Sequence, residues 1–247
     1  SGAACASQDH TPQRTRLEVF WCSCCPPNIN RIFAELGDWL VYDEKDFACI
    51  EQYVACDAKS AHGTLSITGD YINDGKITVS SADYSAKKIA LRLPAWCDRV
   101  TITAEGREVA YSTENGYAII PVNQCFALEL DFHITPVLMA SNPNVTPNVG
   151  RVALCYGPVV YCLEGVDNGP KLNRISMPVT GQSFEVIPNA EYGFPVIAAD
   201  GFRDADQTAL YLRADATAKK PVRLTFIPYY AFANRGASDM QVWVRRG

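Results

Sequence analysis

Three cysteines lie within four residues near the start of the chain, at Cys22, Cys24 and Cys25. Cys24 and Cys25 are adjacent, and the peptide between them holds their β-carbons badly for a disulfide. Thiolates are common nucleophiles and soft-metal ligands in proteins. The cluster therefore predicts a metal site, a nucleophile or both. From spacing alone, a closed zinc site without catalysis explains it about as well.

Two prolines follow the cysteines, and a helix is expected after them. Pro26 and Pro27 fix φ and remove two backbone donors, so we expect a rigid extended turn. Asn28 is a good N-cap. Apolar residues then recur with helical spacing and predict one main helix from Asn28 to about Val41: Ile29, Ile32, Phe33, Leu36 and Leu40. The thiols would lie at the helix N-terminus, where the macrodipole favours a thiolate.

Composition indicates an ordinary globular protein of 247 residues, 48% hydrophobic and 20% charged. The net charge is −5 without a run of Lys or Arg, which argues against a nucleic-acid or membrane partner. None of the three histidines, His10, His62 and His133, forms a metal-spaced pair. Six further cysteines are scattered through strand-like runs and are expected to be buried free thiols: Cys49, Cys56, Cys97, Cys125, Cys155 and Cys162.

From Phe47 onward the pattern changes to short strands separated by turns, which predicts a mainly β fold. Asn115-Gly116 is a strong hairpin signal because both residues tolerate positive φ. The Pro- and Asn-rich stretch 141–148 is the expected internal boundary. Candidate strands are 47–55, 64–68, 76–80, 88–93, 100–104, 117–121, 126–132, 151–156, 159–163, 184–187, 195–198, 210–213, 223–227 and 240–245.

Several stretches together resemble a known family. They are Trp21-Cys22-Ser23-Cys24-Cys25-Pro26-Pro27-Asn28-Ile29, Leu91-Arg92-Leu93-Pro94-Ala95-Trp96, Gly157-Pro158-Val159-Val160-Tyr161-Cys162-Leu163-Glu164, Ile227-Pro228-Tyr229-Tyr230-Ala231-Phe232-Ala233-Asn234-Arg235-Gly236 and Met240-Gln241-Val242-Trp243. In this order they closely resemble glycoside hydrolase family 127, the bacterial β-L-arabinofuranosidases.

The resemblance implies an architecture of two β-sandwich domains preceded by one or a few helices left over from an (α/α)6 barrel. Residues 1–42 would be the C-terminal remnant of that catalytic barrel. Residues 43–140 plus 221–247 would form the first sandwich, and residues 141–220 the second. The rest of the barrel is missing from this sequence.

The resemblance also implies a chemistry. Cys24 would be the nucleophile of a retaining mechanism, and Cys24 and Cys25 would ligate zinc. Cys22 belongs to the pattern without a firm catalytic role. The family's Glu-x-Cys zinc ligands and its general acid/base Glu have no matching positions here, and neither Cys5 nor Glu18 replaces them. Alone, the chain is therefore expected to be inactive, to bind zinc weakly and to associate, for example as a homodimer.

A non-catalytic role is the alternative. The β-sandwiches could support the barrel, dimerise or bind an arabinofuranoside-type glycan. A sugar-stacking platform could come from the aromatic residues, although we expect most of them in the core: Trp96, Tyr161, Tyr229, Tyr230 and Trp243. Resemblance to bacterial enzymes points to bacterial cytoplasm or periplasm.

Overall fold

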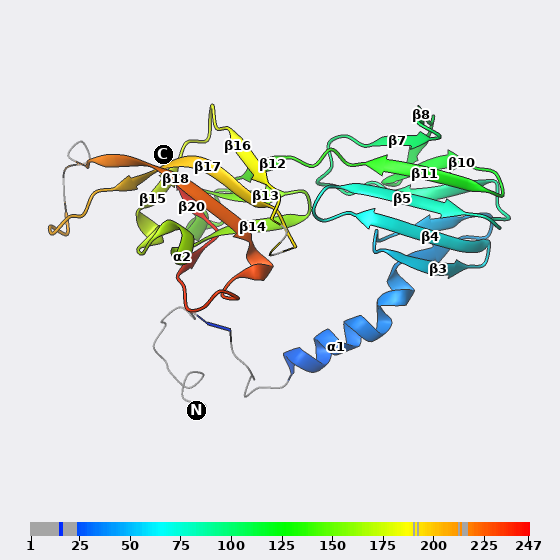
Figure 1. Cartoon of the computed structure of the whole chain (residues 1–247), viewed down its shortest axis with the longest axis horizontal. Helices are drawn as coiled ribbons and strands as arrows, with labels where there is room; N and C mark the ends of the chain where they lie inside the picture. The colour runs from blue at the N-terminus through cyan, green and yellow to red at the C-terminus, as the bar shows by residue number, and fades with distance from the viewer. Residues whose placement is uncertain (1–14, 17–23, 190, 192, 212, 214–216) are drawn as a thin grey trace. The chain divides into compact units, whose positions relative to one another are not determined.

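The computed structural model describes residues 15–16, 24–189, 191, 193–211, 213 and 217–247. They divide into two compact units. The middle unit contains the described residues from Cys24 to Ile134, and the C-terminal unit contains Thr135 to Gly247 together with residues 15–16. Both are built mainly from strands, as the alternating sequence pattern predicts (Figure 1).

The main helix is present but begins earlier than expected. α1 spans Cys25–Glu35, and a 3₁₀ turn, η2 (Leu36–Trp39), continues it. The prediction that Asn28 caps the helix is wrong: its side chain instead donates a hydrogen bond to the carbonyl of Cys24, 2.8 Å away, inside the first turn. Prolines are tolerated there because the first N–H groups of a helix have no intrahelical acceptor. Pro26 and Pro27 thus form part of the helix rather than an extended turn.

The apolar side of α1 is left largely exposed. Ile32 and Phe33 are 62% and 70% exposed, and only Leu40, just beyond η2, is buried. Within the described residues no helix is long and apolar enough to cross a membrane. Whether this helix is a remnant of a barrel stays a prediction.

Two sheets form the middle unit. The five-stranded sheet has the order β1 (Val41–Asp43), β2 (Ala48–Ile50), β6 (Lys88–Arg92), β10 (Tyr117–Pro121), β9 (Ser112–Glu114). The six-stranded sheet has the order β3 (Cys56–Ser60), β4 (Gly63–Asp70), β5 (Lys76–Ser81), β11 (Phe126–Asp131), β7 (Thr101–Ala104), β8 (Arg107–Glu108).

The core of the middle unit lies between these two sheets. Buried side chains alternate with more exposed ones along β4, β5, β10 and β11, so that one face of each of these strands points to the core. The shared cluster includes, from one sheet, Ile50, Ile89, Leu91 and Ile120, and from the other Leu65, Ile67, Ile77, Val79, Ile102, Leu128 and Leu130. The middle unit is therefore the β-sandwich that the sequence predicts.

The hairpin signal is confirmed at β9 and β10. Glu114 pairs with Tyr117, which leaves Asn115 and Gly116 as a two-residue turn. Both have positive φ, 49° and 85°, as a type I′ turn requires.

The C-terminal unit contains one nine-stranded sheet rather than a second pair of sheets. Pairing of β13 with β14 closes a circuit that runs β13–β20–β15–β17–β18–β14. Three strands branch from it, β12, β16 and β19. The bounds are β12 (Pro136–Met139), β13 (Arg151–Tyr156), β14 (Val159–Glu164), β15 (Ile175–Met177), β16 (Phe184–Ile187), β17 (Val196–Asp204), β18 (Lys219–Pro228), β19 (Met240–Gln241) and β20 (Val244–Arg246), with short helices η3 (Thr146–Asn148), α2 (Gly165–Asn168), η4 (Leu172–Arg174) and η6 (Tyr229–Ala231).

Two boundary predictions are wrong for a common reason, long-range strand pairing. Residues 221–247 do not complete the first sandwich, because β18 pairs with β14 and β17 while β20 pairs with β13 and β15. The stretch 141–148 is no domain boundary, because β12 and β13 on either side of it pair with each other. In addition, 210–213 forms no strand in its described residues.

A buried carboxylate joins β14 to the loop after η6. Glu164 is only 1% exposed. It accepts hydrogen bonds from the backbone N–H of Ala233 at 2.8 Å and from the guanidinium of Arg235 at 2.5 Å. Arg235 also binds Asp167 of α2, with a contact of 2.5 Å. This three-residue ion cluster fixes the turn that contains Asn234 and Arg235.

We predict that Arg235→Ala destabilises the chain by about 3 kcal/mol, because it leaves the carboxylate of Glu164 buried without its cation. Urea unfolding measures the loss. Arg223→Ala is the matched control, since Arg223 also binds two carboxylates, Glu185 and Asp200, but at the surface. The control should cost less than about 1 kcal/mol. Equal losses in both variants would contradict the role assigned to Glu164.

Candidate functional site

The predicted site residues, Cys24 and Cys25, lie together at the start of α1. Cys24 is the N-cap and Cys25 the first helical residue, and both side chains are exposed. Their sulfur atoms are 3.7 Å apart, which is a thiol–thiol hydrogen bond and not a disulfide. A helix N-terminus favours negative charge nearby. The fold therefore presents two adjacent, accessible thiols, as the sequence predicts, whereas Cys22 lies outside the described residues.

The sulfur separation suits two ligands of one metal ion. In a tetrahedral site with Zn–S bonds of about 2.3 Å, two sulfur ligands are about 3.8 Å apart. The described residues contain no group of three or more His, Cys, Asp or Glu side chains arranged to hold a metal. Within this part of the chain, Cys24 and Cys25 thus have no third ligand-type side chain arranged with them to hold a metal. Cys5, His10 and Glu18 lie outside the described residues.

The other cysteines are free thiols with unlike environments. Cys49 and Cys162 are buried in the sheets, as expected, and Cys56, Cys97 and Cys155 are half-buried. The expectation is wrong for Cys125, which is exposed because it lies in the turn before β11. Burial, reinforced by neighbouring carboxylates, raises the pKa of Cys49 to about 11 and that of Cys162 to about 12.

The described histidines serve local structure. His62 Nε2 lies 2.9 Å from the carbonyl oxygen of Glu44, and His133 Nε2 lies 2.7 Å from the hydroxyl of Thr101.

The aromatic residues are divided between core and surface. Tyr161 is buried and donates a hydrogen bond to the carbonyl of Pro195, and the ring of Trp96 packs against that of Phe132. Tyr229 and Tyr230 are 50% and 52% exposed, against the expectation of burial.

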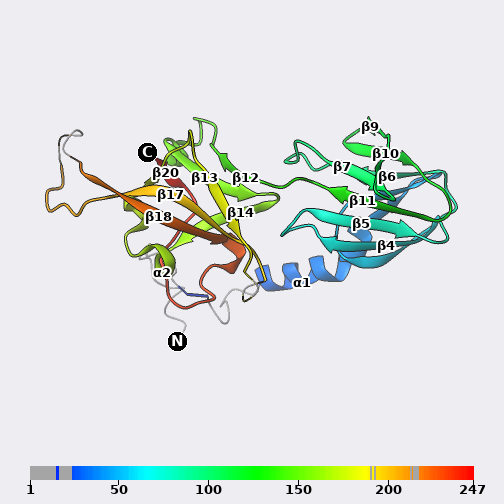
Figure 2. The ribbon, with the colours of Figure 1, turned by 45° about the horizontal axis from the view of Figure 1, so that its top comes forward.

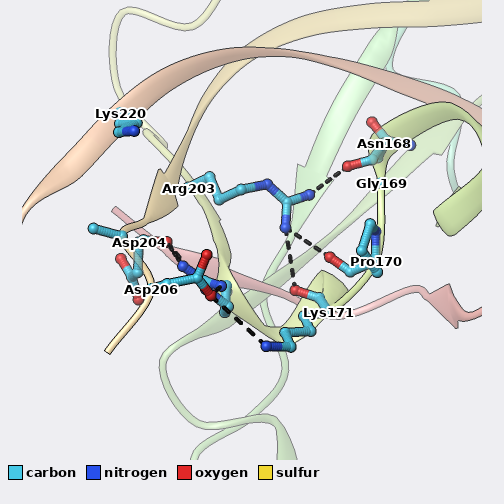
Figure 3. A pocket seen from close by; sticks show the side chains of 10 residues that line it. Asn168, Gly169, Pro170, Lys171, Arg203, Asp204, Asp206 and Lys220 are labelled. Atoms are coloured by element: carbon cyan, nitrogen blue, oxygen red, sulfur yellow. Dashed lines mark hydrogen bonds and ion pairs between the residues drawn. The ribbon is translucent and has the colours of Figure 1, made fainter. Parts of the chain in front are cut away.

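A cavity of about 320 Å³ in the C-terminal unit is lined by several charged side chains (Figure 3). Its guanidinium groups serve the protein itself. Arg203 donates to the carbonyls of Asn168, Pro170 and Lys171. This cavity is therefore explained by loop closure rather than by ligand binding.

A second arginine of the same cavity, Arg174, donates to the carbonyl of Asp204 and binds the carboxylate of Asp206. The hydrogen bond and charge of Arg174 lower the pKa of Asp206. Both guanidinium groups of the cavity, those of Arg174 and Arg203, thus have internal partners.

A second hollow, of about 500 Å³, lies on the outer face of the six-stranded sheet. Sequence reasoning missed it, because its side chains come from four separate strands. The alternating polar positions of these strands were visible, but not the register that brings them together.

Comparison with known proteins identifies the two units. The model "Beta-L-arabinofuranosidase, GH127 middle domain" matches residues 48–131, and "Glycoside hydrolase family 127 C-terminal domain" matches residues 136–245. These ranges fall on either side of the boundary between the two structural units at Ile134.

Similar full-length proteins agree with these matches. The chain is 34% identical to the non-reducing end beta-L-arabinofuranosidase of Bifidobacterium longum subsp. longum, covering 94% of this chain and 38% of that protein. A GH127 beta-L-arabinofuranosidase from Geobacillus stearothermophilus T6 superposes with a TM-score of 0.84 at 29% identity, covering 99% of this chain and 41% of the other. A second structure, described as a GH127 beta-arabinofuranosidase, gives a TM-score of 0.82 at 26% identity, over 94% and 40%.

The middle sandwich and the closed C-terminal sheet thus correspond to two domains of one glycoside hydrolase family. The chain belongs to glycoside hydrolase family 127 and carries that family's middle and C-terminal domains. It spans about two-fifths of the length of the relatives that it matches.

The thiol environments predict selective alkylation at pH 8. The thiolate is the reactive form, and a raised pKa keeps a thiol protonated as long as the pH stays below it. In the folded chain, iodoacetamide should label Cys24, Cys25 and Cys125 within minutes and leave Cys49 and Cys162 unmodified. Peptide mass spectrometry measures the labelling, and unfolding in urea should make all five react. Rapid native labelling of Cys162 would contradict the burial described here.

Proposed function

We propose that this chain is the C-terminal region of a retaining glycoside hydrolase that acts on β-L-arabinofuranosides. Membership of family 127 supports this reaction class. The observation that carries the assignment of the site is the pair of exposed thiols, with sulfur atoms 3.7 Å apart, at the start of α1. The relatives named above are described as arabinofuranosidases, which supports an arabinofuranoside-type substrate.

In the proposed mechanism the Cys24 thiolate attacks the anomeric carbon of the sugar. The glycosidic C–O bond breaks, and the leaving oxygen takes a proton from an acid supplied by another part of the intact enzyme. Water then attacks the same carbon and gives a proton to the conjugate base of that acid, while the C–S bond breaks and the Cys24 thiolate is regenerated. Two inversions give net retention, with sulfur in the place usually taken by a carboxylate.

Zinc is the cofactor that we propose for the intact enzyme, with Cys24 and Cys25 as two of its ligands. The metal would keep both thiols deprotonated and fix their positions. The matching sulfur separation supports this assignment. The remaining ligands would come from the part of the enzyme that this chain does not span.

In the intact enzyme, Cys24→Ser should lower turnover of an aryl β-L-arabinofuranoside by roughly 10⁴-fold or more, the size of effect seen when a nucleophile is removed. Cys97→Ser is the control. Its thiol donates to the carbonyl of Arg99, at 3.1 Å, and has no part in the site, so turnover should stay close to the wild-type value. Undiminished turnover in the Cys24 variant would refute the proposed nucleophile.

The chain by itself should hydrolyse no aryl β-L-arabinofuranoside and should purify with well under one zinc per molecule. Two thiols make an incomplete tetrahedral site, and the described residues contain no third ligand near them. Metal analysis and a hydrolysis assay on the same preparation test both points. Stoichiometric zinc together with clear hydrolysis would show that the chain carries a complete site.

The alternative, a non-catalytic module, is favoured by one observation, the polar hollow on the six-stranded sheet. It is compatible with the enzymatic proposal, since an accessory domain can bind the substrate that a catalytic domain cleaves.

A further inference from the structure

The hollow on the six-stranded sheet is a groove formed by four neighbouring strands. β4, β5, β11 and β7 lie side by side, as Figures 1 and 2 show, and contribute nearly all of its lining. Their apolar residues face the core of the sandwich. The side chains that alternate with them therefore point outward, into the groove.

Strand register arranges these outward side chains in two rows. In one row Thr78 pairs with Glu129, which pairs with Thr103. In the other, Asp70 pairs with Lys76, Lys76 with Asp131, and Asp131 with Thr101. Neighbouring strands are about 4.8 Å apart, so the longer row extends over roughly 14 Å. Each row alternates hydroxyl or ammonium groups with carboxylates.

At the edge of the groove, the backbone of Lys76 packs tightly against Gly69. A β-carbon at this position would lie 2.2 Å from the carbonyl oxygen of Lys76, and the φ of Gly69 is +116°. Only glycine fits there. Elsewhere in the lining, the hydroxyl of Thr101 is hydrogen-bonded to His133 Nε2. The backbone N–H of His133 donates a hydrogen bond to the carboxylate of Asp131 at 2.8 Å.

We propose that this groove binds a neutral arabinose-containing oligosaccharide, as a site separate from the thiols of α1. The ligand class rests on the proposed function. The groove's own chemistry supports it, because threonine hydroxyls both donate and accept, while carboxylates accept from adjacent sugar hydroxyls. A volume of about 500 Å³ is within the range of small-ligand sites.

Charge defines what the groove excludes. Four carboxylates, Asp70, Asp74, Glu129 and Asp131, accompany a single lysine, so an acidic glycan such as an oligogalacturonide is repelled. The carboxylates are also too dispersed to chelate a cation, since no three acidic, His or Cys groups of the described residues converge as a metal site. The charges of the groove therefore disfavour acidic glycans and are compatible with a neutral one.

Titration of the 247-residue chain with arabinotriose, followed by amide chemical shifts in NMR, tests the proposal. Shifts should concentrate on β5, β7 and β11. Glu129→Gln and Thr78→Val, both surface changes within strands, should each weaken binding by about tenfold. Glu114→Gln, an equally exposed change on β9 of the other sheet, is the control and should leave the affinity unchanged.

Three results would overturn the proposal. They are the absence of shifts at millimolar arabinotriose, shifts that Glu129→Gln and Thr78→Val do not alter, and preferential binding of trigalacturonic acid or Ca²⁺ in the groove. Because binding is measured without turnover, the result is independent of the Cys24 experiment. Failure of the groove and failure of the catalytic assignment can therefore be told apart.

Discussion

A buried carboxylate requires a cation, and in the C-terminal unit this requirement is met by Glu164 and Arg235. Glu164 ends β14, a strand that pairs with β13, β18 and β19, so the ion pair fixes the loop after η6 to the centre of the sheet. The same loop receives Arg16, whose guanidinium donates to the carbonyls of Tyr230 and Phe232. One electrostatic constraint thus orders the loop that follows η6, the short helix that carries two exposed tyrosines, Tyr229 and Tyr230.

The two thiols and the groove represent different ways of building a site. Cys24 and Cys25 are neighbours in sequence, and the first turn of a helix is enough to bring their sulfur atoms together. The groove needs the register of four strands from a stretch of more than sixty residues, Gly69 to His133. A site built from sequence neighbours, like the proposed thiol site, is readily shared between chain segments, because each segment contributes a few ligands. A site built from strand register, like the proposed groove, belongs entirely to one domain.

This difference explains how much could be predicted from sequence. Features that depend only on neighbouring residues could be predicted. The strand at 117–121 follows from the alternation of apolar and polar residues, and its Asn115-Gly116 turn follows from the tolerance of both residues for positive φ. The proximity of the two thiols follows from their adjacency in the sequence. The pairing of distant strands could not be predicted, since nothing in the sequence of residues 221–247 indicates that they pair with β13, β14, β15 and β17. α1 begins before the predicted Asn28, because Pro26 and Pro27 occupy its first turn instead of forming an extended turn ahead of it. The groove was missed because alternation reveals outward side chains but not their neighbours.

The closed circuit of the C-terminal unit has a consequence for how the protein is made. β20, which links β13 to β15, consists of Val244–Arg246. During synthesis the middle sandwich can fold once residue 131 has left the ribosome, whereas the circuit of the C-terminal sheet stays open until Val244–Arg246 have also emerged. Contacts between distant residues also form slowly. Until then, unpaired strand edges are exposed, and chaperones would be needed most at this stage.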